Sequence, residues 1–127
     1  MKKIILLFLV LVNTSLFAND SERDIFYKRA KSLVRRQQLE SALSLYERIL
    51  KNYEPTNNIV KDYLNLVLRI NEDSFLKTLE RYKNDIDELT YITKQIDFLQ
   101  KKGELKKSHS VADKYLKNNN NIKDYLT

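Results

Sequence analysis

Side chains that commonly perform catalysis or bind metals are scarce in this chain. Its 127 residues include one histidine and no cysteine, so a zinc site lacks its usual ligands. His109 occupies the same position of a sequence repeat as Leu43 and Leu76, which favours a partly covered helix residue over a catalytic base. No acidic pair lies among apolar residues that would raise a pKa. We therefore expect no enzyme activity and no catalytic residue.

Three acidic residues lie close together at Asp85, Asp87 and Glu88 and raise the question of a calcium site. The segment has neither the glycine nor the ligand spacing of an EF-hand loop. Carboxylates also suit the first turn of a helix, because the amino end of a helix carries partial positive charge. We interpret these residues as helix caps. Since no glycine-rich phosphate loop is present either, the sequence indicates no metal and no cofactor.

Basic residues gather around the single glycine, Gly103, and could suggest nucleic-acid binding. They are Lys101, Lys102, Lys106, Lys107, Lys114 and Lys117. Nucleic-acid surfaces also display aromatic rings for stacking, but most tyrosines here occupy apolar packing positions, for example Tyr46 and Tyr63. We interpret the lysines as a solvated face with weak attraction to anionic lipids or cell-wall polymers, and we expect no nucleic-acid partner.

The first residues have the order of a secretory signal peptide. Met1, Lys2 and Lys3 are followed by an apolar run, Ile4 to Val12, and by a segment that ends in the small residue Ala18. We expect residues 1–18 to be removed after Ala18, which predicts a periplasmic or secreted protein without stable membrane insertion. A retained N-terminal anchor is the alternative, although the apolar run is shorter than the roughly 20 residues that span a bilayer.

The remaining sequence predicts helices throughout. One glycine and one proline provide few turns for a sheet protein. Residues Phe26, Ala30 and Leu33 share one helix face, a second helix begins at Leu39, and it stops before Pro55. Acidic residues also precede lysines by one turn, as in Asp97 and Lys101, and this spacing predicts ion pairs along the helices.

An apolar pattern occurs three times with a fixed period of about 33 residues, which is typical of stacked repeats. Its columns, in order, are Phe26, Ile59 and Ile92; Ala30, Tyr63 and Ile96; Leu33, Leu66 and Leu99; Ala42, Phe75 and Ser108; Tyr46, Leu79 and Ala112; and Ile49, Tyr82 and Tyr115.

The helix pair from Phe26 to Pro55 resembles a tetratricopeptide repeat (TPR). Ala30 and Ala42 match the small positions of that family, and Pro55 lies close to its proline position, whereas Gln37 stands where a glycine is common. The chain thus resembles an exported bacterial member of the TPR family. This resemblance implies an all-α, right-handed solenoid of antiparallel helix pairs over residues 19–117. We expect about three divergent units, at about 23–55, 56–84 and 85–117, followed by a tail or capping helix at 118–127.

Two departures from a regular repeat are visible. Tyr63 and Phe75 occupy both small positions of the second unit, and two bulky side chains cannot replace two methyl groups without separating the helices. We therefore expect the second unit to be the most irregular. The segment from Asn120 to Leu126 nearly repeats the segment from Asn57 to Leu64, which is consistent with a cap, a shortened ancestor or coincidence.

The resemblance also implies a concave groove, lined by the first helix of each unit, that binds a peptide or a partner helix. The implied groove residues are Tyr27, Lys31, Val34, Arg35, Val60, Leu64, Val67, Thr93, Asp97 and Lys101. The three from the second unit are apolar in addition to the packing column of their helix, so they either line the groove or bury against a neighbouring element.

These observations favour a non-catalytic periplasmic adaptor or scaffold that binds an envelope protein or a peptide. A structural or assembly subunit of an envelope complex, acting through self-association as a homo-oligomer, is the alternative. A small hydrolase acting on cell-wall material has little support in the sequence.

Overall fold

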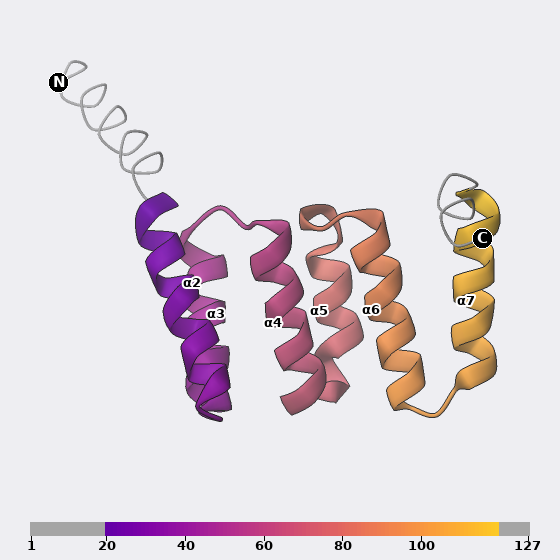
Figure 1. The fold of residues 1–127 in the computed structure, drawn as a ribbon, viewed down its shortest axis with the longest axis horizontal. Coiled ribbons are helices and arrows are strands. Elements are labelled where there is room, and N and C mark those ends of the chain that lie inside the picture. The colour runs from indigo at the N-terminus through magenta and orange to yellow at the C-terminus, as the bar shows by residue number, and fades with distance from the viewer. Residues whose placement is uncertain (1–19, 120–127) are drawn as a thin grey trace, which may run out of the picture. The chain divides into compact units, whose positions relative to one another are not determined.

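The computed structural model describes residues 20–119, and this part of the chain is all-helical, as the sequence predicts (Figure 1). The expected signal peptide and the repeated segment at 120–126 lie outside the described residues. Contacts divide the chain into two compact units, Met1–Pro55 (unit 1) and Thr56–Thr127 (unit 2). Among the described helices, none is long and apolar enough to cross a membrane.

In the described part of unit 1, residues 20–55, two antiparallel helices are present, α2 (Asp20–Arg35) and α3 (Leu39–Asn52). They pack through Ala30 and Ala42, whose small side chains are fully buried and allow a close approach, and through Tyr46 and Ile49. At the end of the pair away from the corner at Gln37, the centroid of the Phe26 ring lies 6.1 Å from that of the Tyr53 ring.

Residues 56–119 of unit 2 form four α-helices, which alternate in direction (Figure 1): α4 (Asn57–Ile70), α5 (Phe75–Arg81), α6 (Glu88–Lys101) and α7 (Leu105–Asn118). Short 3-10 segments, η1 (Glu72–Ser74) and η2 (Lys83–Asp85), flank α5. Thr56 caps α4 by accepting a hydrogen bond from the Ile59 amide at 3.3 Å.

Aromatic rings fill much of the core of unit 2. Phe75 stacks on Phe98 with centroids 5.6 Å apart, and Tyr63 meets Tyr82 edge-on at 5.8 Å. α5, which begins with Phe75, is the shortest of these helices, with 7 residues, whereas α4, α6 and α7 have 14 each.

Candidate functional site

The first candidate site is a line of side chains on α2, here called the α2 strip: Tyr27, Lys31, Val34 and Arg35. Helical spacing places these four residues on one side of α2, next to the side that packs on α3. Arg35 is exposed and the other three are half-buried. The Lys31 Nζ atom lies 4.3 Å from the centre of the Tyr27 ring, within the range of a cation–π interaction.

Tyr27 is held in place from the other side by the core of unit 1. Its ring meets the buried Tyr46 ring nearly edge-on, with centroids 6.2 Å apart and planes inclined by 62°. The strip therefore presents an anchored aromatic ring, a cation over that ring and a partly accessible valine one turn further along. Such a combination can bind an apolar side chain that has an acidic neighbour.

The predicted groove residues of α4 lie in a different environment. Val60, Leu64 and Val67 have exposed fractions of 0%, 0% and 3%. They are buried together with Ile59, Tyr63 and Leu66 of the same helix, so α4 is covered on both of its apolar faces. Because these three side chains belong to the core, the structure offers no access for a partner there. Their burial favours the alternative interpretation, in which they pack against neighbouring elements.

The predicted groove residues of α6 make local contacts within unit 2. The Thr93 hydroxyl donates a hydrogen bond to the Leu89 carbonyl at 2.7 Å, although the residue itself is exposed. The Lys101 Nζ atom donates to the Leu68 carbonyl at 2.5 Å, and Asp97 accepts from Lys94 at 3.5 Å. Lys101 thus helps to join α6 to α4, whereas Asp97 makes its contact within α6.

Lys94 is a buried charge that the sequence did not reveal. Its exposed fraction is 3%, and its Nζ atom donates hydrogen bonds to Asn65 on α4 and to Asp97 on α6. Burial lowers the pKa of Lys94 below its ordinary value of 10.5, while the Asp97 carboxylate opposes this effect. All buried side-chain nitrogen and oxygen atoms of the described residues have partners, so Lys94 has the bonding of a structural lysine.

The acidic turn before α6 is a helix cap, as predicted, through Asp87. Its carboxylate accepts a hydrogen bond from the Thr90 amide at 2.7 Å, and the bonds to Thr90 hold the pKa of Asp87 below its ordinary 3.8. The Asp87 amide in turn donates to the Asn57 side chain at 3.0 Å, which ties the start of α6 to the start of α4.

No chemical centre emerges from the titratable groups of residues 20–119. This part of the chain contains no cluster of three histidine, cysteine or acidic side chains that could hold a metal ion. His109 is exposed on α7. Tyr91 donates a hydrogen bond to Glu80, which raises the pKa of Tyr91 to about 12 and makes its hydroxyl a poor acid.

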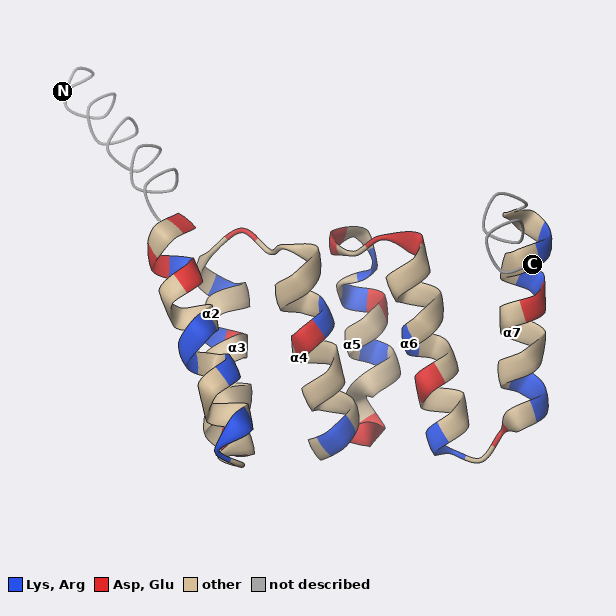
Figure 2. Ribbon diagram, in the orientation of Figure 1, with Lys and Arg blue, Asp and Glu red and all other residues tan. Residues whose placement is uncertain are grey.

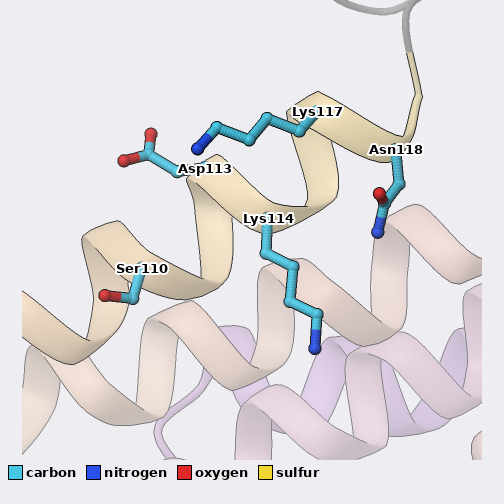
Figure 3. A pocket seen from close by; sticks show the side chains of 5 residues that line it. All are labelled: Ser110, Asp113, Lys114, Lys117 and Asn118. Carbon is cyan, nitrogen blue, oxygen red and sulfur yellow. The ribbon is translucent and has the colours of Figure 1, made fainter.

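Two hollows of unit 2 lie on and beside α7. One, of about 380 Å³, lies between α6 and α7 and has a partly apolar lining of Glu88, Ile92, Gln95, Val111, Lys114, Tyr115, Asn118 and Asn119. The other, of about 350 Å³, is lined by Ser110, Asp113, Lys114, Lys117 and Asn118, all from α7 (Figure 3). Figure 3 shows Lys117 extending back along the helix toward Asp113, while Lys114 points to the other side.

Comparison of the chain with protein-family models, with curated proteins and with solved structures gives no match.

Proposed function

We propose that this protein is an exported, non-catalytic adaptor that binds a protein or peptide partner through the first helix of a TPR-like helix pair. The proposal rests on the α2 strip. The Tyr27 ring contacts the buried Tyr46 ring and remains partly accessible beside Lys31 and Val34. Aromatic and arginine side chains in such settings are enriched at protein interfaces.

The corners of two helix pairs support a repeated, solenoid-like construction. The Gln38 amide bonds to the Leu33 carbonyl and the Gln37 amide to the Val34 carbonyl, at 2.9 and 3.0 Å. Glu104 and Gly103 form the same bonds to Leu99 and Gln100, at 2.9 and 3.0 Å. Each set is a Schellman motif, and the two sets lie at equivalent positions of the first and third occurrences of the apolar pattern.

Binding is assigned to the α2 strip because α4 offers no accessible apolar groove. We propose to test it by capture from the envelope of the exporting cell, using the protein tagged at its C-terminus and mass spectrometry. Replacement of Lys31 and Val34 by Glu reverses one charge and places another charge on the apolar contact. This double variant is expected to retain about tenfold less partner, as for the loss of one interface hot spot.

A matched control is Leu76→Glu, which changes an exposed leucine (46%) on α5 of unit 2 and should leave capture unchanged. Circular dichroism must show equal helicity for all three proteins. Undiminished capture by the folded double variant would show that the α2 strip is not the binding site. Leu64→Glu is unsuitable for this purpose, because a charge at a fully buried position unfolds the helices around it.

Self-association as a subunit of an envelope assembly is the second candidate. It is favoured by large apolar side chains exposed on unit 2, namely Leu76 at 46%, Leu89 at 52% and Leu105 at 58%. Light scattering over a range of concentrations tests it. A mass that rises with concentration, and that returns to the monomer value in Leu89→Asp, would favour assembly over the adaptor.

A further inference from the structure

A second side of α2, separate from the side that carries Tyr27 and Val34, has one sign of charge. Ile25, Lys28, Arg29, Ser32 and Arg36 follow one another at helical spacing, and we call them the basic face. All are exposed except the half-buried Ser32, and Ile25 leaves 63% of its surface open. The opposite side of α2 is the buried one, where Ala30 is fully covered.

The cations of the basic face lack a counter-charge on the described part of the protein. Among residues 20–119, no acidic side chain forms an ion pair with Lys28, Arg29 or Arg36. Arg23, one turn before, differs in pairing with both Asp20 and Asp24 at 3.4 Å. From Ile25 to Gln38 the sequence contains no acidic residue, and Figure 2 shows the acidic residues of α2 only toward its start.

We propose that the basic face docks α2 flat on a bilayer rich in anionic phospholipid. Arginine guanidinium groups form paired hydrogen bonds with phosphate oxygens, and clustered basic residues on a helix are attracted to the negative potential of such a surface. Ile25, in the middle of the same face, reaches into the boundary between headgroups and acyl chains.

The shape of the basic face favours lipid over an acidic protein as the occupant. Its side chains project from the side of a single helix that is turned away from α3, and neither of the two hollows on and beside α7 is lined by them. Long, exposed side chains suit an array of mobile phosphates, which adapts to them. A protein partner would need a matching set of fixed carboxylates. This proposal does not depend on partner binding at the α2 strip.

The absence of tryptophan from the chain permits a local fluorescence test. Ile25→Trp in the full-length protein places the only tryptophan in the middle of the basic face. We expect its emission to shift to the blue with vesicles that contain phosphatidylglycerol, but not with pure phosphatidylcholine vesicles. Because salt screens these charges beyond about 3 Å at 1 M, the shift should disappear in 1 M NaCl. A blue shift on phosphatidylcholine alone, or none on either vesicle, would overturn the proposal.

Two matched sets of charge substitutions distinguish binding through the basic face from an effect of the protein's overall charge. In the Ile25→Trp protein, replacement of Lys28, Arg29 and Arg36 by Gln should raise the lipid concentration at half-saturation by about 100-fold, since each basic residue near the surface contributes about fivefold. Replacement by Gln of three lysines on α7, Lys106, Lys107 and Lys117, removes the same charge. This control should change the lipid concentration at half-saturation by no more than about threefold. Equal effects of the two sets, or no effect of the first, would refute docking through α2.

Discussion

Lys94 shows how residues at the same spacing in the sequence can have different environments. Lys28, Lys61 and Lys94 are each 33 residues apart, yet Lys28 and Lys61 are exposed whereas Lys94 is buried. Its ammonium group reaches Asn65 on the neighbouring helix α4 and Asp97 on its own helix. Only the lysine of this ion pair is buried, since the Asp97 side chain is 39% exposed, and desolvation of the ammonium group offsets much of its attraction to the carboxylate.

Lys94→Met should therefore leave stability at pH 7 unchanged or raise it by about 1 kcal/mol. The pH dependence is more diagnostic. Because the pKa of Lys94 is lowered in the folded chain, the unfolded chain binds more protons between that pKa and 10.5, and stability rises with pH in this range. Urea denaturation should show that rise in the unsubstituted protein and a smaller one in Lys94→Met.

Lys28→Met, at the equivalent position of α2, is the control and should keep the rise. Measurements should end near pH 10. Because the pKa of Tyr91 is raised from 10.0 to about 12 in the folded chain, its ionisation lowers the stability of the protein above pH 10. An identical pH dependence in Lys94→Met would show that Lys94 does not titrate differently in the folded and unfolded chains.

Single side-chain contacts are the features of this fold that the sequence predicts least well. The spacing of Asp97 and Lys101 predicts an ion pair along α6, but Asp97 pairs with Lys94, and Lys101 lies 3.7 Å from Glu72. The same Glu72 pairs with Lys102 at 2.9 Å, which lowers the pKa of Glu72 below 4.5. The contacts of Glu72 with Lys101 and Lys102 depend on the position of η1 beside the end of α6, which a periodic pattern does not encode.

At the scale of elements, the two Schellman corners place different residues in one conformation. Gln37 has a φ of 61° and Gly103 a φ of 77°, so both lie in the left-handed region that favours glycine. A residue with a Cβ atom costs about 1 kcal/mol there, and a Cβ added at Gly103 would meet nothing within 4 Å. The corners therefore differ mainly in backbone strain.

We expect Gln37→Gly to stabilise the protein by about 0.5 kcal/mol, since relief of strain exceeds the extra flexibility of the unfolded chain. Gly103→Gln should destabilise it by about 1 kcal/mol. Thermal unfolding followed by circular dichroism measures both. A lower melting temperature for Gln37→Gly would mean that the contacts of the Gln37 side chain stabilise the fold by more than its backbone strain opposes it.

Helices and corners followed well from the sequence because their signals are local. The stop of α3 before Pro55 and the corner between α2 and α3 lie where proline and apolar periodicity predict them. The burial of Val60, Leu64 and Val67 on α4 could not be predicted from the sequence, because a second apolar face on a helix is compatible both with a groove and with a core. The choice between them depends on what packs there, and one sequence does not contain that information.

At the scale of the whole molecule, the buried apolar side chains of residues 20–119 are distributed unequally between the two units. Unit 1 contributes Ala30, Ala42, Tyr46 and Ile49, two of which are alanines. Unit 2 contributes Ile59, Val60, Tyr63, Leu64, Leu66, Val67, Phe75, Leu79 and Tyr115. Since stability grows with apolar area removed from water, unit 2 holds most of the hydrophobic stabilisation.

This inequality predicts different behaviour of the two units as separate fragments. Residues 20–55 form a helix pair below the roughly 40 residues at which domains fold without disulfides or metals, so the fragment should be mostly unfolded. Residues 56–119 bury enough side chains to unfold in a cooperative thermal transition. Circular dichroism of both fragments at equal concentration measures this. A stable helix pair from residues 20–55 would show that Tyr46, Ile49 and the Phe26–Tyr53 contact stabilise unit 1 far more than their area implies. The α2 strip would then rest on an autonomous module.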